Sequence, residues 1–520
     1  MSFRTQAHGR ELAMATPHYL AGCFALNSFI AQKNTHHAAT VALFSAAFNL
    51  PHLCGLGGDA IILAQSPDGE IQSYNGMGIT GSNQSIEYYR AYGFSAIPSR
   101  GLFSTMIYGA AYALQEFMDC NDLDLREVLR DLAADINKPI PVSPCTYGFI
   151  NKYRKDIVAA PSFQNWRQVY LEASAEVKNS VPHASRLVSI IRREGLRTFY
   201  SGSIAHRFLD RVNSEAPGLF LPEDFESFKA PRFDVANINF LGSSIHCHAG
   251  NAPWLEMAII LGVVERRIAE YARFNGLTML RWCRLAGAVE SFLEQRGIDR
   301  CLAIDPNDLK FVVSEAISAI ESEIESCTLI KPIWGKGADT VFIGSAHADG
   351  TLIGMTSSIF TPFGAMLDPG ESGLLLSNRA FSFSDDPLCS RRLEPNKTAN
   401  HTINSLIVRS SDMDFTMGTT GGFVQVQILV QLLVRILYLK EAPQAALEAP
   451  RFANMGKSNR YQGTLICYEK RNSSTVPESF VPLPALCGRM GVAQIAGILK
   501  SNGDVFSASD PRGEGAALAY

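Results

Sequence analysis

The sequence predicts an α+β protein whose antiparallel sheets are covered by helices, and two observations carry this prediction. From about residue 102 to residue 300 the spacing of apolar residues is mainly helical, with repeats three and four positions apart. Beyond Gly337 the character changes to short strand-like runs that come in pairs across tight turns. Paired strands with helices on both sides indicate covered antiparallel sheets rather than a parallel βαβ array.

The first part of the chain predicts a helix, a turn and a strand. Residues 38–50 form an amphipathic run rich in small residues, which Pro51 ends. The glycine turn 55–58 follows, and the largely apolar run 60–65 is typical of a buried strand. Four further amphipathic helices are predicted over 123–134, 183–194, 256–274 and 279–295.

The last third of the chain predicts two strand pairs and a long helix. Strands are predicted over 340–346, 352–358, 403–409 and 414–418. The turn Ala348-Asp349-Gly350 joins the first two as a hairpin. Gly421 and Gly422 then open an apolar helix that extends through Leu439. A glycine-rich spacer over 335–337 precedes the first of these strands.

Charge and composition exclude several classes of protein. The chain has 520 residues, 47% of them hydrophobic, and 46 basic residues nearly balance 50 acidic ones. No basic stripe occurs, so nucleic acid and anionic membranes are not expected as partners. The most apolar stretches are too short or too interrupted by polar residues to span a bilayer.

The cysteines and the first residues bear on location and cofactors. Eleven cysteines are scattered singly, an odd number without CxxC pairs, which argues against disulfides and favours a reducing compartment. The first residues lack the apolar segment of a signal peptide, so a cytoplasmic location is expected. His246 and His248 could share a strand face, but no further ligands lie nearby, so neither a metal nor a cofactor is expected.

Several segments, in the same order along nearly the whole chain, resemble the γ-glutamyltranspeptidase family. The run 340–350 resembles the strand and turn of that family that begin with a nucleophilic threonine, with the same ten-residue spacing from threonine to glycine. The other matching segments are 55–59, 141–144, 198–202, 355–358, 363–364, 370–378, 395–397, 418–422, 448–452 and 508–512. Residues 75–78, 378–379 and 401–403 further resemble acylase or oxamate-amidohydrolase-type relatives.

The resemblance implies a four-layer αββα sandwich of the N-terminal-nucleophile hydrolase type. It also implies that the chain cuts itself between Asp339 and Thr340, into a large segment, 1–339, and a small segment, 340–520. The two segments are expected to remain together as one catalytic unit, a heterodimer of the chain's own fragments. Further homo-oligomerisation is left open.

Cleavage before Thr340 would turn an inert side chain into a nucleophile. The freed α-amine has an ordinary pKa of about 8, near working pH, and is suited to take the hydroxyl proton. The spacer before Thr340 is flexible enough to bring the Asp339 carbonyl against the hydroxyl, which would then serve cleavage first and substrate attack afterwards. The alternative is an exposed strand threonine that only holds the hairpin.

Two further catalytic roles follow from the resemblance. Ser358 occupies the position of a family threonine whose hydroxyl supports the nucleophile, and serine preserves that donor and acceptor. The alternative is a strand serine that faces water. Gly421 and Gly422 precede a helix and can offer unhindered backbone N–H groups to an oxyanion. The alternative is a tight strand-to-helix turn.

Three residues are predicted to contact the substrate. His401 and Thr402 align with the substrate-contacting hydroxyl pair of the family, and Arg379 lies where the family places a polar substrate-binding side chain. A guanidinium there could fork onto a carboxylate. For each of the three, a capping or surface contact is the alternative.

The acyl pocket departs from the family pattern. The arginine that holds the γ-glutamyl α-carboxylate in glutathione-cleaving relatives has no counterpart in 74–80, and Ile79 stands at the arginine position of the acylase-type relatives. Val341 and Phe342 replace the threonine and histidine that usually follow the nucleophile. These changes indicate a more apolar acyl pocket or an enzyme that has lost its activity.

The first functional hypothesis is an amide hydrolase or acyltransferase that forms an acyl-enzyme on Thr340 and passes the acyl group to water or an amine acceptor. The resemblance implies a γ-glutamyl compound, glutathione or a glutathione conjugate, as the substrate. A small non-glutamyl amide in a biosynthetic or detoxification pathway fits the altered pocket equally well. A non-catalytic relative that keeps the fold for binding is the remaining alternative.

Overall fold

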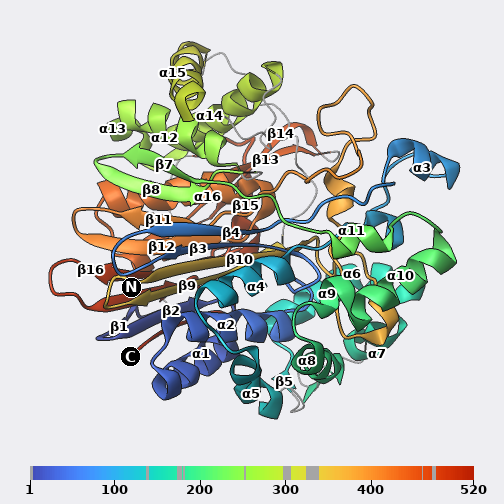
Figure 1. Ribbon diagram of the computed structural model, residues 1–520. Coiled ribbons are helices and arrows are strands. Elements are labelled where there is room, and N and C mark those ends of the chain that lie inside the picture. Colours follow the sequence, from blue (N-terminus) through green and yellow to red (C-terminus); the bar gives the residue numbers. More distant parts are fainter. Residues whose placement is uncertain are drawn as a thin grey trace.

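Two antiparallel β-sheets pack face to face at the centre of the molecule, and helices cover the outer face of each (Figure 1). This arrangement is a four-layer αββα sandwich, as predicted. The computed structural model describes residues 4–135, 140–171, 178–179, 182–250, 253–296, 306–323, 339–458, 461–470 and 476–520.

The six-stranded sheet holds the first predicted hairpin near its centre. Its strands are, in spatial order, β18 (Ala516–Ala519), β2 (Leu12–Thr16), β9 (Asp339–His347), β10 (Leu352–Phe360), β3 (Asp59–Gln65) and β4 (Ile71–Gly76). All neighbouring strands are antiparallel. The hairpin of β9 and β10 is therefore enclosed by β2 and β3 from the start of the chain.

The seven-stranded sheet contains the second predicted strand pair. Its strands are, in spatial order, β1 (Ala7–Gly9), β17 (Val505–Ser509), β16 (Ala493–Leu499), β12 (Met413–Thr419), β11 (Leu406–Arg409), β8 (Ser243–His248) and β7 (Val235–Phe240). β11 begins three residues later than predicted. The segment before it is held from the other sheet, because the Thr356 hydroxyl donates to the Asn404 carbonyl (2.9 Å).

Small and aliphatic side chains fill the space between the two sheets, which allows them to approach closely. This buried cluster consists of Ala15, Leu63, Ala346, Leu352, Ile407 and Ala496.

A helical layer covers each sheet. The six-stranded sheet is covered by α1 (Tyr19–Gln32), α2 (Thr35–Asn49), α4 (Ala110–Cys120) and α5 (Leu125–Asp135), with α8 (Pro182–Glu194) against α5. The seven-stranded sheet is covered by α12 (Trp254–Arg266) and α16 (Gln425–Leu433), and α14 (Gly276–Gln295) and α15 (Pro306–Glu323) pack on α12.

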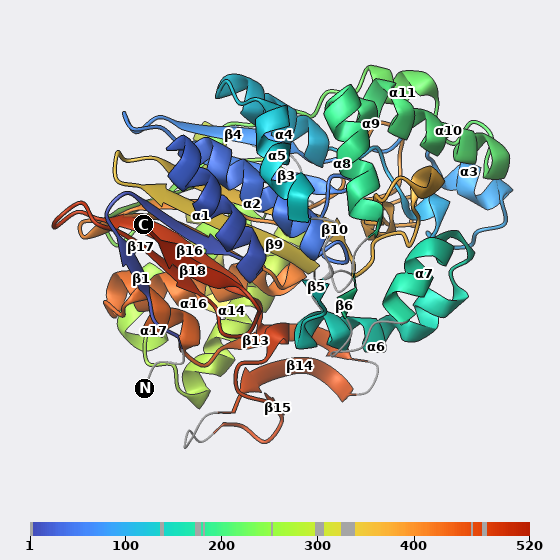
Figure 2. The ribbon, with the colours of Figure 1, turned by 90° about the horizontal axis from the view of Figure 1, so that it is seen from below.

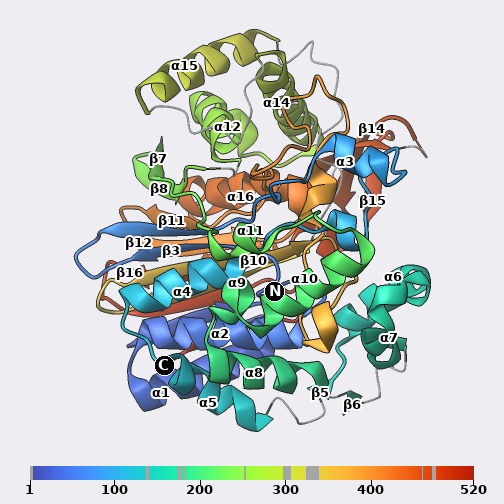
Figure 3. The ribbon, with the colours of Figure 1, turned by 45° about the vertical axis from the view of Figure 1, so that its right-hand side comes forward.

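The remaining elements extend this core. The helices are α3 (Ile86–Ala91), α6 (Pro144–Ala159), α7 (Gln164–Leu171), α9 (Thr198–Ser201), α10 (Ser203–Glu215), α11 (Pro222–Glu226), α13 (Ile268–Tyr271) and α17 (Pro443–Glu448). Two small sheets comprise β5 (Ile140–Pro141) with β6 (Lys178–Asn179), and β13 (Phe452–Ser458) with β14 (Tyr461–Glu469) and β15 (Val481–Leu483). Figure 2 shows the second small sheet beside α14, and Figure 3 shows α6, α7, α9 and α10 gathered at one end of the sandwich.

The predicted helices occur, with two differences. The helix predicted over 256–274 is interrupted at Arg267, whose φ of −125° and ψ of 33° are not helical, and α13 follows the break. The helix predicted from Gly421 begins with the 3-10 turn Gly422–Val424 and ends with the π-helical turn Val434–Tyr438.

Three buried histidines make stability depend on pH. Burial lowers the pKa of His18 to about 4 and that of His248 to about 3. Burial, together with His18, lowers the pKa of His52 to about 3. These rings are neutral in the folded protein at neutral pH, whereas an unfolded histidine takes up a proton below about pH 6.5. Stability therefore falls as the pH decreases from about 6.5, because the unfolded state binds more protons.

We predict that His52→Phe reduces this loss of stability in acid. The His52 ring contacts those of Phe149 and Phe363, and neither ring nitrogen has a hydrogen-bond partner among the described residues. Between about pH 6 and pH 4, the free energy of unfolding of the wild type should fall more steeply than that of the variant, by about 1.4 kcal/mol per pH unit. Urea unfolding across this range measures the difference.

The exposed His206 provides the control for this comparison. His206→Gln should leave the pH slope of the wild type unchanged. Equal slopes for the wild type and His52→Phe would contradict the assignment of the acid loss to His52.

Candidate active site

A β-bulge lies at the predicted nucleophile. Thr340 is the second residue of β9, and its side chain is buried. In the pairing of β9 with β10 the register shifts between Ser357 and Phe360, so that Ser358 and Ile359 together oppose Thr340. A bulge of this kind bends the strand and changes the direction of its side chains.

Ser358 lies between the predicted nucleophile and a carboxylate. On β3, Asp59 is directly opposite Ser358 in the register. The Ser358 hydroxyl accepts a hydrogen bond from the Phe360 backbone N–H (3.0 Å) and a longer one from Nη2 of Arg379 (3.5 Å). Thr340, Ser358 and Asp59 thus lie at one level on three neighbouring strands, and both hydroxyl-bearing residues are buried rather than facing water.

Arg379 and Asp59 form a buried ion pair beside Ser358. Nε of Arg379 lies 3.0 Å from Oδ2 of Asp59, and the two side chains are 2% and 3% exposed. The Gly78 N–H donates to Oδ1 of Asp59 (2.9 Å), and the guanidinium lies 4.5 Å from the centre of the Phe360 ring. Burial raises the pKa of the Asp59 carboxyl group, and the charge of Arg379 opposes that rise. The guanidinium that was predicted to hold a substrate carboxylate therefore has a carboxylate of the protein as its partner.

His401 lies close to the same carboxylate, with its Nε2 3.8 Å from Oδ1 of Asp59. Burial, followed by the charge of Arg379, lowers the pKa of His401 well below its usual value, so the ring is neutral. Neither ring nitrogen has a hydrogen-bond partner among the residues that the structure describes. Thr402, the next residue, is half-buried. Two of the three predicted substrate-binding residues, Arg379 and His401, thus meet at Asp59.

Gly421 and Gly422 form the turn between β12 and α16. Their φ angles are 121° and 57°, which residues other than glycine rarely adopt. The turn is fixed by Thr420, whose N–H donates to the Val492 carbonyl (3.1 Å) and whose hydroxyl accepts from the Val492 N–H (2.8 Å). A helical segment starts at Gly422, and the first N–H groups of a helix have no partner within it.

β12 and α16 connect this glycine turn to the other predicted residues. Gly418 of β12 packs directly against the ring of Phe342, two residues from Thr340. With its amide nitrogen turned toward Thr402, the Gln425 side chain donates a hydrogen bond to the Thr402 carbonyl oxygen (2.7 Å). The glycine turn is therefore tied both to the start of β9 and to the segment of His401.

A second buried ion pair supports the glycine turn. Nη2 of Arg451 lies 2.6 Å from Oδ2 of Asp510, and the two side chains are 2% and 0% exposed. Nη1 of Arg451 donates to the Met490 carbonyl (3.1 Å), just before the segment that pairs with the turn. The matching segments 448–452 and 508–512 thus hold the loop behind the predicted oxyanion site.

Asp59 was not among the site residues predicted from the sequence. The segment 55–59 contributed to the prediction only as one of the segments that resemble the family. The available signal was a carboxylate immediately before a predicted buried strand, because a buried charge requires a partner. Every residue of β3 is buried in the structure, and Asp59 lies at the centre of the polar cluster.

The two strand histidines singled out by the sequence make separate contacts. Nδ1 of His248 lies 2.7 Å from the Ser73 hydroxyl, and Nε2 of His246 lies 3.2 Å from the Ser244 hydroxyl. Within the described ranges, no group of three His, Cys, Asp or Glu side chains is arranged to hold a metal ion.

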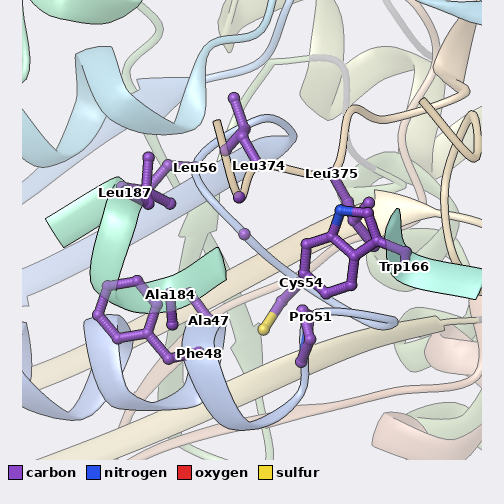
Figure 4. A pocket seen from close by; sticks show the side chains of 12 residues that line it. Ala47, Phe48, Pro51, Cys54, Leu56, Trp166, Ala184, Leu187, Leu374 and Leu375 are labelled. Carbon is purple, nitrogen blue, oxygen red and sulfur yellow. The ribbon is translucent and has the colours of Figure 1, made fainter. Parts of the chain in front are cut away.

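Cys54 lies beside the glycine turn 55–58 as a buried thiol. Burial raises the pKa of this thiol, and its Sγ lies 3.7 Å from the Leu50 carbonyl oxygen. Figure 4 shows it among apolar side chains, with Trp166 on one side and Phe48 on the other. The cavity that they line measures about 20 Å³, room for about one water molecule. A cavity of this volume has no room for an amide substrate.

The sequence matches one protein family over most of its length, and curated relatives match nearly the whole chain. The γ-glutamyltranspeptidase family profile matches residues 29–520. The glutathione hydrolase-like YwrD proenzyme of Bacillus subtilis is 23% identical over 98% of each chain. The oxamate amidohydrolase proenzyme of Klebsiella pneumoniae is 25% identical over 100% of each chain.

A solved structure shares the fold over the whole chain. The crystal structure of cephalosporin acylase from Bacillus halodurans superposes with a TM-score of 0.82 at 19% identity, covering 100% of this chain and 98% of that one. The αββα sandwich is therefore of the N-terminal-nucleophile hydrolase type, as predicted. No helix in the described part of the chain has the length and apolar character needed to cross a membrane.

We predict that Gly58→Ala destabilises the protein through Ser358. A Cβ atom on Gly58 would lie 2.2 Å from the backbone carbonyl oxygen of Ser358, so β10 would have to shift at the bulge. Overpacking of this kind should cost about 1–3 kcal/mol of unfolding free energy, measured by chemical denaturation. Gly55→Ala is the control in the same turn, because no atom lies within 4 Å of its added Cβ. Equal stabilities of the two variants would contradict the close approach of Gly58 to Ser358.

Proposed function

Because the chain belongs to the γ-glutamyltranspeptidase family, we propose that it cuts itself between Asp339 and Thr340 and then uses the Thr340 hydroxyl to attack an amide. The family match and the relatives named as hydrolases and acylases make the chain an amide hydrolase of the N-terminal-nucleophile type. The register of β9 and β10, with Ser358 opposite Thr340 at a β-bulge, is the observation that carries the assignment of the nucleophile.

The position of Thr340 supports this role. A strand in the middle of a sheet holds its first residue rigidly, and Thr340 is the second residue of β9, paired on one side with β10. Cleavage would leave Thr340 as a new N-terminus with a free amine. That amine, with an ordinary pKa of about 8, would take the proton from the hydroxyl of the same residue.

The chemistry then follows in two steps. The Thr340 oxygen attacks the amide carbonyl, and the backbone N–H groups at Gly421 and Gly422 stabilise the negative charge on the carbonyl oxygen. The protonated amine passes its proton to the leaving nitrogen, which departs and leaves an ester on Thr340. Water attacks the ester and releases the acid, or an amine acceptor takes the acyl group. Ser358 positions the attacking hydroxyl throughout.

The two proposed fragments, 1–339 and 340–520, share both sheets. β9 and β10 of the small fragment pair with β2 and β3 of the large fragment. In the other sheet, β11 of the small fragment pairs with β8 of the large one. Separation would expose strand edges in both sheets, so we expect the cut protein to remain a heterodimer.

Two classes of acyl donor are candidates. A γ-glutamyl compound is favoured by the name of the Bacillus subtilis relative, and a small non-glutamyl amide by that of the Klebsiella pneumoniae relative. The engagement of Arg379 by Asp59 favours uncharged members of the second class over γ-glutamyl compounds and over oxamate, whose acyl groups both carry a carboxylate. Assays of a γ-glutamyl anilide beside N-acyl and oxamate-type amides separate the two.

We predict that Thr340→Ala abolishes both chain cleavage and amide hydrolysis. The purified wild type should give two bands on a denaturing gel, and the variant a single band. Hydrolysis of any amide accepted by the wild type should fall by at least about 10³-fold, because the attacking oxygen is gone. Thr340→Ser is the matched control: it keeps a hydroxyl, so it should still give two bands, more slowly.

A wild type that stays a single chain and hydrolyses no amide would favour the non-catalytic alternative. Two bands from Thr340→Ala would show that an external protease makes the cut, and would contradict self-cleavage by this residue.

A further inference from the structure

We propose that Asp59 determines which acyl groups the site accepts: it neutralises the Arg379 guanidinium beside Ser358 and so reserves the site for acyl groups without a negative charge. The inference rests on the proposed role of Thr340. It narrows the substrate class to amides whose acyl group carries no negative charge.

The ion pair adjoins Ser358, which lies opposite Thr340 in the sheet. Ser358 faces Thr340 across the bulge, Nη2 of Arg379 lies 3.5 Å from the Ser358 hydroxyl, and Nε of Arg379 lies 3.0 Å from Asp59. The guanidinium is also stacked on Phe360, which has a φ of 75°, an angle rare for a residue with a Cβ atom. Contacts on several sides therefore fix Arg379 at this end of the strands.

The charges around Ser358 cancel. Asp59 supplies one negative charge and Arg379 one positive charge, and the neighbouring His401 ring is neutral. The Gly78 N–H donates to Asp59, and the next residue, Ile79, adds no charge near Ser358. The backbone of Ile79 forms β-bridges with Ile107 and Thr398. A substrate carboxylate next to Ser358 would approach the Arg379 guanidinium, which is already paired with Asp59, and would be repelled by the Asp59 carboxylate.

The energetic consequence is a preference against anionic acyl groups. Binding of a carboxylate by a free, buried guanidinium typically raises affinity by about ten-fold or more. With Asp59 in place this gain is lost, and the like charge of Asp59 acts against a second carboxylate at low dielectric. An uncharged acyl group meets neither effect.

Two p-nitroanilides of equal chain length test the proposal. The pentanoyl and glutaryl anilides differ only by the terminal carboxylate of the glutaryl group. The wild type should have the higher kcat/KM for the pentanoyl donor. Asp59→Asn leaves Arg379 without its carboxylate, and should shift the ratio of the two kcat/KM values toward the glutaryl donor by about ten-fold or more. The shift should appear mainly in KM, because the carboxylate is held equally in the ground and transition states.

Two controls separate this role from a general loss of structure. The double variant Asp59→Asn/Arg379→Gln removes both charges and should keep the wild-type preference for the pentanoyl donor. Asp368→Asn removes another buried carboxylate, which accepts hydrogen bonds from Trp166 (2.8 Å) and Ser372 (2.8 Å), and should leave the donor ratio unchanged. If Asp59 had a purely structural role, Asp59→Asn would lower kcat/KM for both donors by the same factor.

The outcomes are distinguishable from a failure of the proposed function. Fragment formation on a denaturing gel reports the role of Thr340 for every variant. Binding of pentanoate and glutarate, measured by calorimetry, reports the charge preference without any turnover or cleavage. Stronger binding of glutarate than of pentanoate by the wild type would overturn the inference, even if Asp59→Asn does not fold. An unchanged donor ratio in folded Asp59→Asn would overturn it as well.

Discussion

The pairing of two residues of β10 against one residue of β9 is the constraint on which the site depends. A regular ladder would alternate the side chains of both strands and would place Thr340 and Ser358 in simple opposition. The bulge adds Ile359 opposite Thr340 and bends β10 at this place, while Ser358 stays level with both Thr340 and Asp59. Gly58 permits this arrangement, because its missing side chain leaves room for the Ser358 carbonyl.

Burial of the polar groups around the bulge explains their pairing. A charged side chain in a low-dielectric interior is costly unless it has a partner, so Asp59 and Arg379 stabilise each other's charged forms. Arg451 and Asp510 do the same behind the glycine turn. One ion pair thus adjoins the hydroxyl groups and the other supports the predicted oxyanion donors. Fixed charges of this kind preorganise a site, and they also decide which ligand charges it tolerates.

Local patterns predicted helices such as those over 38–50, 123–134, 183–194 and 279–295, and the two strand pairs, whereas the family resemblance pointed to Thr340 and Ser358. β2 and β18 were missed, because Leu12–Thr16 and Ala516–Ala519 lack alternating polar residues and become strands only by pairing with each other and with β9. The partner of Arg379 was missed for a related reason. Asp59 lies 320 positions away in the chain, and no local spacing reports a contact of that range.

A cut of the backbone before Thr340 would free the amine of this residue at the start of a buried strand. N-terminal sequencing of the purified wild-type protein detects that cut. Two sequences should appear in equal amounts, one from the start of the chain and one that begins Thr-Val-Phe-Ile-Gly, from Thr340 onward. A single sequence from the start of the chain, or a second one that begins at any other residue, would show that the chain is not cut before Thr340.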